Sequence, residues 1–458
     1  MNYSTTAEIL KTPENRMTAS APRRNSAEAG TPSVLTLTAW YAVAWMSLSN
    51  AIGVGLAVLL LWPHPGRWLG EWSYGRWMPV HMNTQLYGWA SLPLVAWLLR
   101  IYEADRGELA RWSRAALLLW SAALALGSIS WLDGHNSGKL FLNWTGYARV
   151  FFPLAIVFLW CVLAAALAAH WRHPKNASRA VRMAKAGGLV LLLMVPLAIY
   201  VAASPGIYPP VNPASGGPTG ASQLESVLII VLILFILPYG VSRRAEHGKR
   251  WIVTSWVAFA TEALLCLSLG RHDVSNYRPT QIISLGSLLL WVPLMPAYYS
   301  AFVWRENTRL WRRAVLAWWA VLIPSGWCLF LPVVLDRLKF TDGLVGHSLL
   351  AMAGFVTSLL VLLLIGLLGE DGDAFQTRWS FIAWQAGTAT YIAIMFIAGW
   401  IEGGDPAFTM TSNTTRNTIY FIRLLCGIAM TAASWEWLWQ LTVRIRARGR
   451  AAERGVAG

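Results

Sequence analysis

The stretch LVGHSLLAMAGFVTSLLVLLLIGLL, residues 344–368, decides the class of this protein. It carries no charged side chain, and a helix of this length spans the roughly 30 Å hydrocarbon core of a bilayer at about 1.5 Å per residue. Its one polar ring, His347, lies near its start. An imidazole that enters a membrane helix needs a partner for its ring nitrogens, so His347 is a candidate functional residue.

Similar apolar runs recur along the 458 residues, of which 56% are hydrophobic and 13% charged. Strand-like alternation of about ten residues is absent, so helices are the remaining way to cross a bilayer. The sequence therefore predicts an all-α, polytopic membrane bundle of twelve transmembrane helices. The predicted spans are 34–62, 79–101, 113–132, 148–169, 187–203, 223–241, 251–270, 280–303, 314–335, 344–368, 380–401 and 417–443.

Three regions follow from this pattern: a disordered N-terminal tail (1–33), the membrane domain (34–443) and a basic C-terminal tail (444–458). With twelve spans both tails share one side, and that side holds 25 Lys and Arg against 8 in the loops of the other side. Positive residues favour the cytoplasmic side, which predicts an inner-membrane protein with both termini in the cytoplasm. The net charge of +15 then reflects topology and lipid contact, and indicates no nucleic-acid partner.

The 28 tryptophans are expected to form aromatic belts at the two membrane interfaces. The four cysteines lie inside the predicted spans and form no C-x-x-C-H motif. Covalent c-type haem attachment is therefore not indicated.

Two of the eight histidines enter predicted helices at nearly the same depth, close to the outer face. His81 is three residues into the second span, and His347 is four residues into the tenth. Histidines at matched depth on different helices are how a bundle holds b-type haem. The alternative is that each imidazole caps a helix start or bonds a neighbouring carbonyl.

Several stretches resemble subunit I of the haem-copper oxidases, most closely the catalytic subunit of the C-family (cbb-type) cytochrome c oxidases. GRWMPVHMNTQLYGW (75–89) resembles the second helix of that family, and TDGLVGHSLLAMAG (341–354) resembles the tenth. RHDVSNYRPTQIISLGSLLLWVP (271–293) is similar to the copper-site region that follows helix seven. The resemblance runs in order from about residue 38 to 445 and implies twelve spans.

The resemblance implies a role for each matched residue. His81 corresponds to a ligand of the low-spin haem, and His347 to the axial ligand of the high-spin haem. Arg423 matches an arginine that reaches haem propionates, although an interhelical bond is an equal alternative. The second low-spin ligand is replaced by Leu349, which lies about 200° around the helix from His347. The implied cofactor is haem b, one or two per chain, and Met352 is one candidate for a sixth ligand.

The copper site of the family is largely missing. The histidine of helix six has no counterpart, the His-His pair reads Arg271-His272, and the cross-linking tyrosine is replaced by Leu265. One imidazole does not make a stable redox copper site, so His272 alone predicts no bound copper. The expected function is a b-haem-binding subunit linked to respiratory electron transfer, without the oxygen reduction of the family.

Two alternatives remain open: a haem-free structural or assembly paralogue, and a true terminal oxidase with unusual ligands. Expected partners are membrane lipid and other respiratory subunits, such as membrane-anchored c-type cytochromes. Glu262, near the middle of the seventh span, belongs either to a former proton route or to a hydrogen bond with a neighbouring helix.

Overall fold

The computed structural model describes residues 32–139, 142–172, 179–204, 207, 224–269, 277–411 and 413–456. Within these residues, nine helical segments are long and apolar enough to cross a membrane. The protein is therefore an all-α, multi-pass integral membrane protein. The nine segments are Val34–Leu61, Leu109–Leu132, Ala148–Trp171, Arg179–Ala202, Glu246–Leu269, Pro279–Ser300, Asp342–Phe375, Arg378–Glu402 and Thr414–Ala451.

Helical structure occupies each of the twelve predicted spans. The single-helix spans are α1 (Val34–Leu61), α4 (Leu109–Leu132), α5 (Ala148–Arg172), α6 (Arg179–Ala202), α8 (Lys249–Leu269), α11 (Arg309–Leu329), α15 (Arg378–Glu402) and α16 (Thr414–Val456). The composite spans are α2 (Tyr74–Asn83) with α3 (Leu92–Ile101), α7 (Leu224–Ile236) with the 3₁₀ turn η4 (Leu237–Gly240), α9 (Pro279–Ser287) with α10 (Trp291–Ser300), and α13 (Asp342–Leu349) with α14 (Thr357–Leu368).

Three of the twelve predicted spans are not among these nine segments, and the sequence of each explains why. The second is divided between α2 and α3, the sixth contains only a short apolar helix, and α11 begins with several arginines. Short elements complete the described chain, among them α12 (Val334–Leu338), η9 (Gly369–Phe375) and the paired strands β1 (Arg243–Arg244) and β2 (Phe302–Val303).

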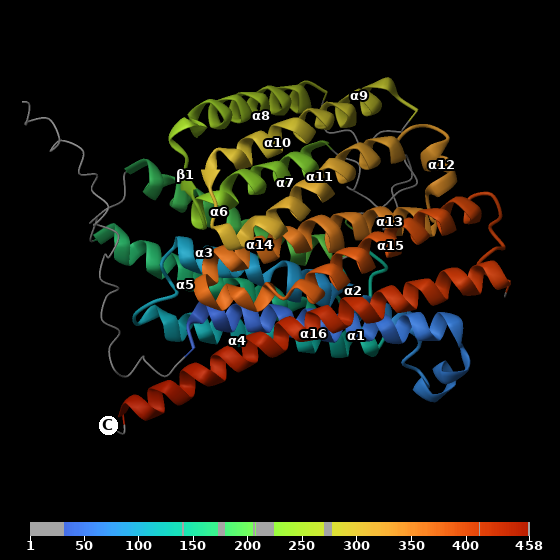
Figure 1. The fold of residues 1–458 in the computed structure, drawn as a ribbon, viewed down its shortest axis with the longest axis horizontal. Helices are drawn as coiled ribbons and strands as arrows, with labels where there is room; N and C mark the ends of the chain where they lie inside the picture. The colour runs from blue at the N-terminus through green and yellow to red at the C-terminus, as the bar shows by residue number, and fades with distance from the viewer. Residues whose placement is uncertain are drawn as a thin grey trace, which may run out of the picture. The chain divides into compact units, whose positions relative to one another are not determined.

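The helices of the membrane domain lie side by side (Figure 1). In the first half, α1 packs against α2 and α3, α4 packs against α2 and α5, and α5 packs against α6. In the second half, α11 contacts α10 and α14, and α13 contacts α15. Contacts of α14 with α1 and α3 join the two halves.

Large aromatic side chains fill much of the interior. Seven tryptophans are among the fully buried side chains: Trp131, Trp144, Trp291, Trp311, Trp319, Trp384 and Trp437. These seven indole rings are enclosed by other parts of the chain and do not face lipid. Buried indole N–H groups need acceptors, and these are available inside a helical bundle at irregular backbone positions and small polar residues.

Two of the crossing helices, α6 and α8, are mostly uncovered by the rest of the chain, with only 11% of each apolar window buried. In a membrane protein such faces contact lipid.

The two histidine-bearing spans share an irregularity. A π-helical segment, η3 (Thr84–Ala90), follows α2, and a second one, η8 (Leu350–Val356), follows α13. Such segments widen the helix by one residue and are frequent at functional sites.

Residues Ser33–Thr442 form one compact unit. From Val443 the chain belongs to a second unit, in which α16 continues as helix to Val456. Residues 1–31 of the predicted N-terminal tail lie outside the described residues.

Candidate functional site

His81 lies in the second half of α2, and its ring faces α1. Its Nδ1 is 2.8 Å from the backbone carbonyl oxygen of Ser49, and the hydroxyl of Ser49 donates to the carbonyl of His81 at 2.7 Å. A carbonyl only accepts, so Nδ1 carries the proton and Nε2 has an available lone pair. Within the described part of the chain, Nε2 has no hydrogen-bond partner.

The His81 ring fits against Gly53 of α1. A Cβ atom at Gly53 would lie 2.7 Å from Cε1 of the ring and 3.4 Å from Nε2. Real Cβ atoms do not approach other atoms to 2.7 Å, so this position admits the ring only because it is glycine. Ser49 and Gly53 lie one helical turn apart and together fix the plane of the imidazole.

His347 lies in α13 and has a different environment. Its Nδ1 is buried and has no hydrogen-bond partner among the described residues. A Cβ atom at Gly326 of α11 would lie 3.2 Å from Cε1 and 3.4 Å from Nε2 of this ring. A buried ring nitrogen without a partner is costly, so this imidazole is a candidate for binding something beyond the chain.

The helices α13 and α15 approach each other closely beside His347. A Cβ atom at Gly346 would lie 2.9 Å from Cβ of Met395, and one at Gly399 would lie 2.0 Å from the backbone nitrogen of Gly343. Gly346 and Gly399 therefore permit the short distance between the two backbones. This contact fixes α13, and with it the position of His347.

The starts of α2 and α13 lie at the same end of the bundle. Tyr74, the first residue of α2, is within electrostatic reach of Asp342, the first residue of α13. His81 is seven residues beyond Tyr74 and His347 is five beyond Asp342. At about 1.5 Å per residue, the distances of the two imidazoles from their helix starts differ by about 3 Å.

Arg423 of α16 lies between these helix starts. Its Nη1 is 2.7 Å from Oδ2 of Asp342, and its Nε is 3.4 Å from the hydroxyl oxygen of Tyr391 on α15. The guanidinium also lies 5.0 Å from the ring centre of Tyr420. Of the two predicted roles for Arg423, the interhelical bond is present. Its partner Asp342 could not be identified from the sequence pattern.

Glu262 of α8 is 4% exposed and accepts hydrogen bonds from two neighbouring residues. The hydroxyl of Ser287 donates to Oε1 at 2.7 Å, and Nε1 of Trp291 donates to Oε2. The predicted hydrogen bond with a neighbouring element is therefore confirmed. These two bonds connect α8 to α9 and α10.

Other predicted site residues are not brought together. His272 and Arg271 lie outside the described residues. Met352 lies in η8, where its side chain packs against the core, and a five-residue step turns it about 140° around the helix from His347. Among the described residues, no three His, Cys, Asp or Glu side chains are grouped closely enough to hold a metal ion.

Comparison with known proteins adds no family assignment, because neither a family model nor a curated protein matches this chain.

The partners Ser49 and Gly53 could not be predicted from sequence. They lie about thirty residues before His81, and a serine followed four residues later by a glycine is common in membrane helices. No sequence pattern identified Gly326 as a neighbour of His347 either.

Proposed function

We propose that this chain is a b-haem-binding membrane subunit related to subunit I of the haem-copper oxidases. It acts in respiratory electron transfer and lacks the copper-dependent oxygen reduction of that family. The proposal includes twelve spans, an inner-membrane location, both termini in the cytoplasm, and partner subunits that carry c-type haem.

The observation that carries the proposal is the hydrogen bond between Nδ1 of His81 and the carbonyl of Ser49. Histidines that bind metal ions commonly donate their other ring N–H to a carbonyl, which fixes the tautomer and orients the lone pair. His81 has this arrangement, and its Nε2 is unpartnered among the described residues. A histidine held only for packing gains nothing from an unpaired ring nitrogen.

His347 supports the same reading, since its Nδ1 is buried without a partner and its ring is admitted by a glycine of the next helix. Both rings thus fit a ligand that requires an open imidazole nitrogen. His81 and His347 would each hold a b-type haem through a ring nitrogen, and the haem would supply a one-electron carrier. Leu349 occupies the position that corresponds to the second low-spin haem ligand of the family. This chain would therefore offer each haem one histidine.

The chain's own residues have definable tasks in this scheme. Ser49 holds the His81 tautomer, Gly53 and Gly326 leave room for the two rings, and the surrounding apolar helices exclude water. A dry environment of this kind raises or lowers a redox potential according to the charges near it. Arg423 and Asp342, at the start of α13, form an ion pair and so neutralise each other.

A haem-free structural or assembly paralogue is the second candidate, and one observation favours it. Arg423 already binds Asp342 and contacts Tyr391, whereas a propionate contact would require a free guanidinium edge. The uncovered faces of α6 and α8 suit helices of a partner subunit as well as lipid. This candidate predicts stable protein without bound haem.

The test is an absorption spectrum of the full-length protein, purified in detergent after expression with added haem precursor. We expect a reduced b-type α-band and a pyridine haemochrome that gives one or two haems per chain. Carbon monoxide should shift part of the spectrum, because the chain would offer each haem only one histidine.

His81→Ala and His347→Ala should each remove part of the Soret absorbance. His247→Ala is the matched control, since His247 is exposed in a short loop turn. Absence of a Soret band in wild-type protein that is folded and monodisperse would overturn the proposal and leave the structural paralogue.

A further inference from the structure

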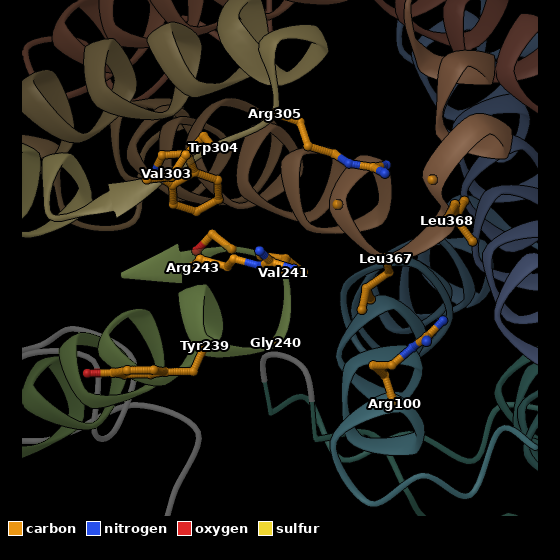
Figure 2. Close-up of a pocket in the computed structure, with 13 residues that line it drawn as sticks. Arg100, Tyr239, Gly240, Val241, Arg243, Val303, Trp304, Arg305, Leu367 and Leu368 are labelled. Atoms are coloured by element: carbon orange, nitrogen blue, oxygen red, sulfur yellow. The ribbon is translucent and has the colours of Figure 1, made fainter. Parts of the chain in front are cut away.

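A cavity of about 670 Å³ lies at the other end of the histidine-bearing spans (Figure 2). His81 and His347 lie near the starts of α2 and α13, whereas the cavity is bordered by the ends of α3 and α14. The loop before β1 and the loop after β2 close its remaining sides. Three of its lining residues are arginines: Arg100, Arg243 and Arg305.

These arginines come from distant parts of the chain. Arg100 is in the last turn of α3, Arg243 is in β1, and Arg305 precedes α11. In Figure 2, Arg100 and Arg305 extend from opposite sides toward the segment that holds Leu367 and Leu368. The fold therefore assembles a concentration of positive charge that no single sequence segment carries.

The carboxylates needed to neutralise this charge are few. None of the lining residues is acidic. Arg100 has one ion pair, with Asp105 at 3.5 Å, and its Nε is buried without a partner. Within the described residues, Arg243 and Arg305 make no ion pair. Like charges around one cavity repel, and a bound anion removes that repulsion.

The cavity is built from ordered contacts. Strands β1 and β2 pair Arg243 with Val303, so the two loops are tied together. A Cβ atom at Gly366 would lie 2.7 Å from Cβ of Val241, so α14 packs directly on the loop before β1. Gly369 adopts φ +64°, a left-handed conformation that ends α14 and turns the chain away beside the Arg305 guanidinium.

Apolar side chains also line the cavity. Leu367, Leu368, Val303 and Trp304 line the cavity beside the charged groups. Apolar walls do not contribute to the binding of a small free anion. A phospholipid carries a glycerol and acyl chains next to its phosphate, and the acyl chains can contact such walls. Guanidinium groups form paired hydrogen bonds with phosphate oxygens.

We propose that this cavity binds the phosphate group of an anionic phospholipid from the leaflet at the basic side of the protein. Basic pockets between membrane helices are suited to such headgroups. The site is separate from the histidine region, so this inference does not rest on haem binding. It assigns Arg243 and Arg305 to the phosphate and Leu367, Leu368 and Trp304 to the apolar part of the lipid.

The experiment uses full-length protein in a neutral detergent, with lipid retention measured by native mass spectrometry. Cardiolipin and phosphatidylglycerol are compared with phosphatidylcholine, and inorganic phosphate is tested separately for displacement. Hydrogen bonds from charged groups are stronger than neutral ones, so Arg243→Gln with Arg305→Gln should weaken anionic-lipid retention at least about tenfold. Arg313→Gln is the matched control, because Arg313 is an exposed arginine of α11 outside the cavity.

The expected result is loss of anionic lipid from the double variant alone, with unchanged phosphatidylcholine retention. A variant with Arg305→Lys in place of Arg305→Gln should regain part of the anionic-lipid retention, because lysine keeps the positive charge. This result distinguishes loss of charge from misfolding. Equal loss in Arg313→Gln would overturn the proposal, because general surface charge would then explain retention. Displacement of lipid by millimolar inorganic phosphate would overturn the lipid assignment, and equal retention by wild type and double variant would overturn the site itself.

Discussion

Arg423 of α16 and Asp342 of α13 form an ion pair of 2.7 Å that joins helices 81 residues apart in sequence. The two side chains are only 11% and 17% exposed. Asp342 also donates its backbone N–H to Glu402 at the end of α15. One aspartate thus ties α13 to both α15 and α16, near the end where His81 and His347 lie.

Breaking this pair on one side should destabilise the bundle strongly. Arg423→Gln or Asp342→Asn leaves a buried charge without its partner, which costs about 3–5 kcal/mol. The double variant should lose less than the sum of the two singles. A double-mutant cycle on unfolding in mixed detergent measures this coupling, and simple additivity would contradict a direct interaction.

Gly53→Ala should disturb the His81 ring, because the new Cβ would overlap Cε1 at 2.7 Å. If His81 binds haem, this variant loses b-type absorbance while the chain stays helical. Gly55→Ala is the control, since no atom lies within 4 Å of a Cβ there. Equal spectra of the two alanine variants would mean that the ring position does not govern haem binding.

Glu262→Leu should destabilise the contact of α8 with α9 and α10. It leaves the indole N–H of Trp291 without its acceptor, at a cost of about 1–3 kcal/mol, while the hydroxyl of Ser287 keeps the carbonyl of Ser284 as an acceptor. Thermal unfolding measures the loss, and Glu262→Gln should retain part of the stability through its carbonyl oxygen. Thr261→Ala, at an exposed position of the same helix, serves as the neutral comparison.

Stability should fall in acid through Asp336, which lies in the short helix α12. The hydroxyl of Tyr277, followed by Lys339 and the backbone N–H of Val333, holds the pKa of this carboxyl below its usual value. A carboxyl whose pKa is lower in the folded state stabilises the fold above the unfolded pKa of about 3.9. That contribution is lost as the pH falls through the folded pKa.

The corresponding measurement is the unfolding midpoint between pH 6 and pH 3 for wild type and Asp336→Asn. The difference between them should shrink below about pH 4, because the protonated carboxyl resembles the amide. A difference that stays constant over this range would show that the carboxylate charge does not contribute.

The proposed topology makes a separate prediction. A fluorescent protein fused after residue 458 should fold and fluoresce, while alkaline phosphatase at the same point should be inactive, because the C-terminus is proposed to be cytoplasmic. Fusions in the loop around residue 138 should give the opposite pair of results. Phosphatase activity at the C-terminus would reverse the orientation.

The sequence alone determined that this protein is a bundle of membrane helices. Uncharged runs such as 344–368 leave the backbone no other way to satisfy its hydrogen bonds in lipid, and this holds whatever the neighbours are. It also predicted the matched depth of His81 and His347, because depth depends only on counting residues from a helix start. The oxidase resemblance and bound haem remain predictions.

Only the tertiary structure decided what each polar side chain contacts. Three of these contacts join residues that are distant in sequence. The carbonyl of Ser49 accepts from His81, Arg423 pairs with Asp342, and one cavity is lined by Arg100, Arg243 and Arg305. Helix periodicity tells which residues share a face, but not which other helix covers that face. Which helix covers a given face is decided by packing, for example at Gly53 and Gly399, where the missing side chain allows close approach. Such contacts produce no local sequence pattern from which they could be predicted.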